Sequence, residues 1–491
     1  FTDSIRSLPP LEIKAIRLSE QAPFAISNIS KAQIALNNVG QDLPFLLENT
    51  PSVVVHADAG IGVGYTGIRI RGTDATRINF TLNGIPYNDA ESMGTFFVNI
   101  PDFGSSVNSI QIQRGVGTST NGAGAFGASV NLMTNEYNPS AYLSLQNTAG
   151  SFNSFKNNLV FGSGLLNNKF TIDGRVSSIR SDGFIDRANS DLKSYFLSST
   201  YWGEKSSLRL NIFSGKEKTY QAWYGVPQEL LATNRTFNPA GTEKADAPYD
   251  NQTDNYTQTH YQLFYNKNIN SNWKWNTAFY LTTGKGYYEE YKAGVNFSDY
   301  NIDIKGKQNV PADLVRRRWL DNHFVGVVYG LNYQPLSNLK FTFGGAVNSY
   351  SGAHFGELIW AQFASNSQIY DRYYDNNALK QEASAYLKTN YQIQRDLDSF
   401  KDKVELFFKE FTNINGVKPD KNKINDIKHF FVEYILLKKL ILEMGKYLFL
   451  LPARKIWLLS LQKYKYTPKQ LKTPQQAHHP LQLLYLVYLI D

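Results

Sequence analysis

From about residue 138 onward, apolar and polar residues alternate along the chain in segments of about ten residues. In one of them Phe170, Ile172 and Val176 share a face, and Thr171 and Arg175 lie on the other. A period of two predicts β-strands with one apolar face. Ten such segments can be counted, at 141–149, 151–163, 169–181, 191–202, 206–216, 258–268, 273–285, 322–334, 339–351 and 379–393.

The connections between these segments alternate in length. Short ones lie near 164–168, 203–205, 269–272 and 335–338, and long ones at 182–190, 217–257, 286–321 and 352–378. Short turns on one side and long loops on the other are typical of an outer-membrane barrel, whereas a soluble β-sandwich has no such strict alternation. The pattern therefore predicts an antiparallel transmembrane β-barrel that is partial, with about ten strands. Plugged barrels use about 22 strands, so these ten should leave two open edges.

The first 137 residues have a different, mixed and Gly-rich pattern. Short helical turns are predicted at Lys31–Leu36 and Leu43–Glu48, and Asn83-Gly84 is a signal for a tight turn. Short strands are predicted at Ser52–His56, Thr66–Arg71, Ile78–Leu82, Ser109–Arg114 and Ala128–Met133. The segment 25–137 should therefore form a compact α+β domain ahead of the barrel.

After about residue 395 the alternation stops, and the tail 396–491 is rich in Lys and Leu with two helix-like stretches. It is either a separate helical domain or an accidental tail from a frameshift or a misassembled gene. We favour the accidental tail because the barrel is still open at this point. The predicted organisation is an N-terminal segment 1–24, an α+β domain 25–137, a partial barrel 138–395 and an irregular or helical tail 396–491.

Composition narrows the possible class of protein further. The chain has no Cys, its mean hydropathy is −0.37, and no apolar run reaches about 18 residues, so disulfides and transmembrane helices are not expected. It begins at Phe1 without a signal sequence, so either a signal peptide was removed or the start is missing. The net charge of +8 lies mostly in the tail, with 16 Lys+Arg against 10 Asp+Glu, and residues 1–395 hold 34 against 32. This distribution argues against a nucleic-acid partner.

Several stretches of the N-terminal part resemble one protein family. They are Asp42–Val53, Gly67–Gly72 (GIRIRG), Thr81–Asp89 (TLNGIPYND) and Ile112–Thr134, which contains QRGVG and NGAGAFGASVNLMT. Four such motifs in this order resemble the plug domain of TonB-dependent outer-membrane receptors. Gly215–Pro227 and Arg318–Asn322 look like barrel segments of Bacteroidetes iron-complex receptors.

The resemblance implies a transporter and not an enzyme, with no cofactor, in the bacterial outer membrane. The implied function is energy-coupled import of an iron complex, a ferric siderophore. A TonB-type periplasmic protein would move the plug, and outer-membrane lipid would surround the barrel. Haem, cobalamin or an oligosaccharide are alternative ligands. A passive porin or an adhesin is the alternative from another class, as is a soluble β-protein with a helical interaction domain.

The resemblance also implies roles for two sets of residues. Plug arginines of the family bond to barrel glutamates and hold the plug, and the matching residues here are Arg71 and Arg114. The alternative is that each is a solvated surface charge. The family's TonB box, an extended segment that pairs with the energy-coupling protein, is best matched by Leu11, Glu12, Ile13, Lys14 and Ala15, ahead of Ala22–Ile29.

Aromatic side chains in or beside the long predicted loops are the candidates for ligand binding. They are Tyr220, Trp223, Tyr224, Tyr287, Tyr288 and Trp360. Aromatic rings offer large contact faces at low entropic cost, although they could equally stack on each other to fold the loop. No catalytic constellation or metal-ligand spacing is found, and the G-x-G-x-x-G match at Gly62–Gly67 lacks the helix that a dinucleotide site needs.

Overall fold

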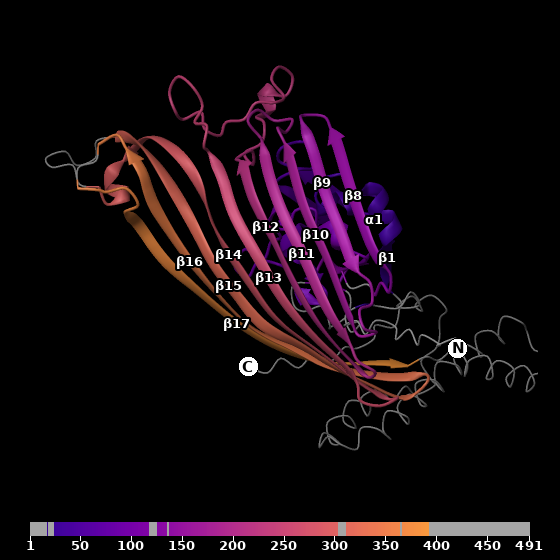
Figure 1. Ribbon diagram of the computed structural model, residues 1–491. Helices are drawn as coiled ribbons and strands as arrows, with labels where there is room; N and C mark the ends of the chain where they lie inside the picture. The colour runs from indigo at the N-terminus through magenta and orange to yellow at the C-terminus, as the bar shows by residue number, and fades with distance from the viewer. Residues whose placement is uncertain are drawn as a thin grey trace, which may run out of the picture. The chain divides into compact units, whose positions relative to one another are not determined.

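The computed structural model describes residue 17 and residues 24–116, 125–134, 137–302, 311–363 and 366–391 (Figure 1). The first-choice TonB box, Leu11–Ala15, and the tail 396–491 lie outside the described residues. Among the residues that are described, no helix is long and apolar enough to cross a membrane.

The N-terminal elements form a small α+β plug with two sheets. Its helices are α1 (Lys31–Asn37) and the 3₁₀ helices η1 (Leu43–Leu47), η2 (Ala75–Arg77), η3 (Phe97–Asn99) and η4 (Phe103–Ser106). Its strands are β1 (Ala25–Ser30), β2 (Val53–Ala57), β3 (Thr66–Ile70), β4 (Ile78–Leu82), β5 (Ile85–Pro86), β6 (Ser109–Arg114) and β7 (Ala128–Met133). One sheet has the order β1-β6-β7-β4-β5, and β2 pairs with β3 in the other. The predicted α+β class is confirmed.

Local sequence signals explain where the plug elements begin and turn. Ser30 caps α1 in a capping box with Gln33, which satisfies backbone donors that the helix leaves free. Asn83 and Gly84 both have positive φ, 57° and 85°, as a tight turn between β4 and β5 requires. The core of the plug is formed by fully buried side chains of its strands, including Phe80, Ile110 and Leu132.

The second part is a ten-stranded sheet in which every strand lies beside its neighbours in sequence. The strands are β8 (Ala141–Gly150), β9 (Ser154–Ser163), β10 (Phe170–Ser181), β11 (Ser190–Trp202), β12 (Ser206–Tyr220), β13 (Thr253–Asn268), β14 (Trp273–Asn296), β15 (Pro311–Leu336), β16 (Leu339–Ala361) and β17 (Arg372–Tyr391). All ten predicted strands are present. Within the described residues β8 and β17 remain as the two edges, as expected.

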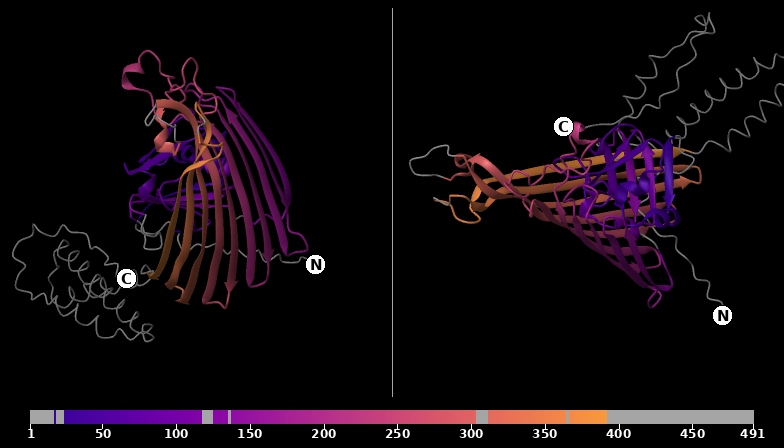
Figure 2. Two further views of the ribbon diagram at one scale, coloured as in Figure 1. Left: turned by 90° about the vertical axis from the view of Figure 1, so that its left-hand side faces the viewer. Right: turned by 90° about the horizontal axis from the view of Figure 1, so that it is seen from above.

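The two faces of this sheet differ as the alternation predicts. In β12 the side chains of Leu208 and Leu210 are 44% and 40% exposed, whereas those of Arg209 and Asn211 are 7% and 0% exposed. The sheet curves around one side of the plug (Figure 2). Its buried, polar face contacts the plug, and its apolar face is exposed. An outward apolar face and an inward polar face are the arrangement of a barrel that sits in lipid.

Two of the long loops are shorter than the sequence predicted. β14 continues to Asn296, β15 begins at Pro311, and β16 continues to Ala361, so most of the expected loops 286–321 and 352–378 is strand. The reason is that the alternation of apolar and polar residues ends earlier in the sequence than the hydrogen bonding between neighbouring strands. In the extended part the cross-strand neighbours are charged pairs such as Glu289 with Arg317, which hold the strands together without an apolar face.

Candidate functional site

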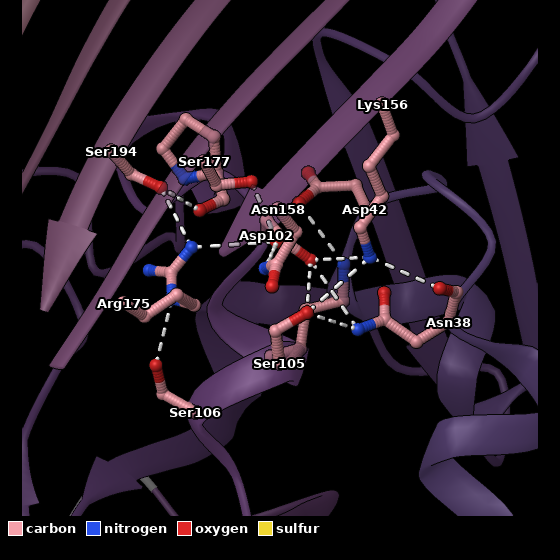
Figure 3. A network of polar contacts seen from close by, with 12 residues as sticks. Asn38, Asp42, Asp102, Ser105, Ser106, Lys156, Asn158, Arg175, Ser177 and Ser194 are labelled. Carbon is pink, nitrogen blue, oxygen red and sulfur yellow. Dashed lines mark hydrogen bonds and ion pairs between the residues drawn. The ribbon is translucent and has the colours of Figure 1, made fainter. Parts of the chain in front are cut away.

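A buried ionic network joins the plug to the inner face of the sheet (Figure 3). Its centre is Asp102, which precedes η4 with a left-handed backbone (φ 53°). The carboxylate of Asp102 lies 2.7 Å from Nζ of Lys156 in β9 and 3.5 Å from Nη1 of Arg175 in β10. Ser177 donates to the same carboxylate at 2.6 Å, and Asn158 also donates to it. We call these five residues the Asp102 network.

Further hydrogen bonds surround the network. Lys156 donates to the carbonyl oxygen of Asn38 at 3.0 Å, and Arg175 donates to the hydroxyls of Ser106 and Ser194 at 2.8 and 2.9 Å. Burial alone would raise the pKa of Asp102, but the cations of Arg175 and Lys156 outweigh this and hold the pKa of the carboxyl below its ordinary value. Buried charges of this kind are tolerated when they are paired and fully hydrogen-bonded.

An aromatic contact lies directly beside the network. Phe103, the residue after Asp102, packs against Phe196 of β11 and Phe213 of β12 with ring centroids 6.4 and 5.2 Å apart. Phe213 in turn stacks on His260 of β13 at 4.5 Å. Phe196 and Phe213 belong to the same buried cluster as the plug core. The plug and the sheet wall therefore share one hydrophobic core.

A second polar joint lies at the plug loop that precedes β3. The hydroxyl of Tyr65 contacts the carboxylates of Asp254 in β13 and Glu217 in β12, the latter at 3.4 Å. Burial, followed by the two nearby carboxylates, raises the pKa of Tyr65 well above its ordinary value, so the hydroxyl stays protonated. It is thus a hydrogen-bond donor placed between two acids of the wall.

A third joint is made by the plug loop around Glu91. Tyr350 of β16 donates to the Glu91 carboxylate at 2.6 Å, and Nε2 of His354 lies 2.8 Å from the same oxygen. Lys380 of β17 donates to the backbone oxygen of Ala90 at 3.0 Å. Polar contacts from β9 to β17 thus hold the plug along most of the width of the sheet.

The two arginines named from the resemblance lie elsewhere. Arg71 follows β3 with a left-handed backbone (φ 53°) and an exposed side chain. Arg114 ends β6 and donates to the backbone oxygen of Pro51 at 3.2 Å. Neither arginine forms an ion pair with a glutamate within the described part of the chain. Sequence reasoning also missed the Asp102 network, although Arg175 was on the predicted polar face of its strand.

The six aromatic candidates fall into separate groups. Trp223 packs edge-on against Tyr65 and Tyr288 at 5.6 and 6.1 Å, and Tyr224 lies beside it at 6.3 Å. These four residues, which we call the mouth aromatic group, stand at the end of the sheet that carries the long loops. Tyr288 is in register with Asp254 and so shares the plug-facing side of the sheet.

The other three candidates have different surroundings. Tyr287 points to the opposite face from its neighbour Tyr288 and packs against Trp319 and Arg317 at 4.6 and 4.2 Å. Trp360 stacks on Tyr291 at 6.2 Å. Tyr220 is buried, and its hydroxyl donates to the backbone oxygen of Tyr249 at 2.8 Å, which fixes the loop between β12 and β13.

The second TonB box candidate, Ala22–Ile29, overlaps a strand of the plug. Its residues Ala25 to Ile29 belong to β1 and pair with β6, so this part of the segment is already hydrogen-bonded within the plug. No group of three or more His, Asp or Glu side chains that could hold a metal ion occurs among the described residues.

Comparison with known proteins gives the same assignment for the N-terminal part. Residues 19–129 match the model of the TonB-dependent receptor plug domain, which covers the elements that carry Tyr65, Glu91 and Asp102. Residues 19–129 therefore form a plug domain of the TonB-dependent receptor type. The plug domain predicted from the motifs is thus confirmed, and receptors that carry this domain are outer-membrane transporters. No curated protein sequence matches the chain.

Solved structures of receptors share the fold. The chain is similar to the unliganded ferric citrate transporter FecA (16% identity, TM-score 0.55, 76% of this chain and 54% of that one). It is also similar to the copper transporter OprC (12%, 0.55, 76% and 54%) and to the siderophore receptor PiuA from Acinetobacter baumannii (13%, 0.52, 76% and 56%). The chain spans about half the length of these receptors. At such low identity the likeness concerns the fold alone.

Proposed function

We propose that this receptor imports an iron complex, a ferric siderophore, across the outer membrane in an energy-coupled step. The observation that carries the proposal is the Asp102 network. The plug is held by a buried carboxylate between two cations and by a hydrophobic core shared with the wall, and charges left buried without their partners as the plug moves would be costly. Displacement of the plug therefore requires work from outside the receptor.

A passive porin is the competing reading, and the network argues against it. A porin keeps an open aqueous channel, whereas here a plug is joined to the wall by polar and apolar contacts. The work on the plug would come from a TonB-type periplasmic protein that pairs with an extended segment of the receptor. Leu11–Ala15 remains our candidate for that segment, and Arg71 and Arg114 remain candidates for further plug–wall ion pairs.

The ligand is proposed to bind at the mouth aromatic group. Trp223 and Tyr224 are exposed, and with Tyr288 of the wall and Tyr65 of the plug they form a group of aromatic rings where plug and wall meet. Aromatic faces suit a flat, partly apolar chelate. Ferric siderophore and copper transport are stated for receptors of similar fold, and iron is preferred here because most of the similar receptors are named for iron complexes.

The test is uptake in cells that make this receptor. Deletion of its gene should abolish accumulation of radiolabelled iron from a ferric siderophore, and an uncoupler that collapses the inner-membrane proton gradient should have the same effect on the intact strain. Uptake that continues after addition of the uncoupler would identify a passive channel. A gene deletion that changes uptake of haem, cobalamin or an oligosaccharide, and not of iron, would reassign the ligand.

A further inference from the structure

Three consecutive arginines, Arg316, Arg317 and Arg318, stand in β15 at the end of the sheet that carries the long loops. In the ladder with β14 their partners in register are Glu290, Glu289 and Tyr288, in the same order. The first two arginines are neutralised by those glutamates at 2.8 and 2.7 Å. Arg318 faces a tyrosine instead of an acid.

Arg318 is held between two aromatic rings. Its guanidinium lies 5.4 Å from the ring of Tyr288 and 5.8 Å from the ring of Tyr374, and its Nε donates to the hydroxyl of Tyr374 at 3.3 Å. No acid of the described chain forms an ion pair with it, and its two terminal nitrogens have no hydrogen-bond acceptor there. Two cation–π contacts orient the guanidinium without consuming its remaining donors.

The position of Arg318 links it to the ligand surface. Tyr288, on which it stacks, also packs against Trp223, so the cation is next to the mouth aromatic group and on the plug-facing side of the sheet. Among the acids beside this group, Glu217 is buried and with Asp254 contacts the hydroxyl of Tyr65, and Glu290 is paired with Arg316. Arg318 is therefore the exposed charge of this group that has no ion-pair partner among the described residues.

We infer that Arg318, between Tyr288 and Tyr374, binds an oxyanion group of the transported complex and selects anionic chelates over neutral or cationic ones. A preoriented guanidinium donates two parallel hydrogen bonds to a carboxylate or catecholate, and the flanking rings take the organic part of the ligand. The inference rests on the proposed function for the identity of the site. It adds to that function the charge of the ligand and the residue that recognises this charge.

Binding to the whole purified receptor in detergent tests this, with fluorescence of Trp223 and the other tryptophans as the signal. Two probes are compared, a trianionic ferric tris-catecholate and a neutral ferric trihydroxamate of similar size. The wild type should bind the trianion more tightly. Arg318→Gln should weaken binding of the trianion by about tenfold or more and leave the neutral probe unchanged, since the charge-assisted hydrogen bonds to the anion are lost.

Two further variants separate charge from folding. Arg318→Lys keeps the charge and should retain part of the preference for the trianion, and Arg235→Gln, at an exposed arginine in the loop between β12 and β13, should bind as the wild type does. Equal affinity of wild type and Arg318→Gln for the trianion would overturn the inference, as would a wild type without preference between the probes. A receptor that binds through Arg318 but supports no uptake would contradict the proposed function alone.

Discussion

The Asp102 carboxylate of the plug lies 2.7 Å from the ammonium of Lys156 in the wall, and the two side chains are 0% and 1% exposed. The acid is on the plug and the bases are on the wall, which is the reverse of the arginine–glutamate arrangement that the family resemblance implies. The contact brings together residues 54 positions apart, one directly before η4 and one in β9. Charge complementarity between plug and wall is thus built at a place that the motifs do not mark.

Replacement of Asp102 by Ala should loosen the plug strongly. Lys156 and Arg175 would remain buried without a counter-charge, and breaking a buried pair in this way costs about 3–5 kcal/mol. The opening free energy of η4, measured by hydrogen exchange at the amide of Val107, which donates to Gly104, should fall by that order. Arg180→Ala is the control, because its pair with Asp191 is 62% and 41% exposed and contributes less than about 1 kcal/mol. Equal exchange in both variants would show that the network does not hold the plug.

Much of this architecture could be predicted from the sequence because it depends on local pattern. The strict alternation of Leu208 and Leu210 with Arg209 and Asn211 fixes both the strand and its two faces. The turn at Asn83-Gly84 was predicted in the same way, since few residues other than Asn and Gly adopt positive φ readily. These signals need no knowledge of distant residues.

The parts that could not be predicted depend on contacts between distant segments. Asp102 lies in a loop with no periodic pattern, and only the seating of the plug shows that it meets Lys156 and Arg175. In the same way, neighbouring Tyr287 and Tyr288 looked equivalent in the sequence. The ladder with β15 places them on opposite faces of the sheet, so that only Tyr288 contacts Trp223.

The plug should become less stable as the pH rises from about 4 to 7, because of Asp42. Burial, partly offset by hydrogen bonds from Thr66 and the Leu43 amide, raises the pKa of Asp42 from 3.8 to about 7. The folded plug then holds a proton that the unfolded chain has lost, so stability is full below pH 4 and declines until the folded pKa is reached, by about 1.4 kcal/mol per unit. Asp42→Asn mimics the protonated acid and should remove this slope. The exchange rate of the Leu43 amide, compared between variant and wild type at each pH, measures it, and parallel profiles would contradict the assignment.

Removal of the Tyr65 hydroxyl should weaken the joint at Glu217 and Asp254. Tyr65→Phe leaves two neighbouring acids of the wall without their shared donor, and an unsatisfied buried polar group costs about 1–3 kcal/mol. The amide of Asp58, which donates to the backbone oxygen of Tyr65, should exchange faster in the variant. Tyr87→Phe is a matched control, because that hydroxyl donates to the Phe96 backbone oxygen within the plug. A larger effect of the control would mean that the wall acids contribute nothing to holding this loop.

The division of the aromatic candidates predicts which of them the ligand contacts. Trp223→Ala and Tyr224→Ala remove exposed rings of the mouth aromatic group and should each weaken binding of a ferric siderophore by about tenfold, since an aromatic contact contributes about 1 kcal/mol beyond the buried area. Tyr287→Ala is the control on the same strand as Tyr288, and it should leave affinity unchanged because its ring packs against Trp319 and Arg317 on the other face. Equilibrium titration of the purified receptor with the iron complex gives all three values. The opposite result, loss of affinity in Tyr287→Ala with normal binding by the other two variants, would place the ligand on the opposite face of the sheet. The mouth aromatic group would then serve only to pack the loop between β12 and β13.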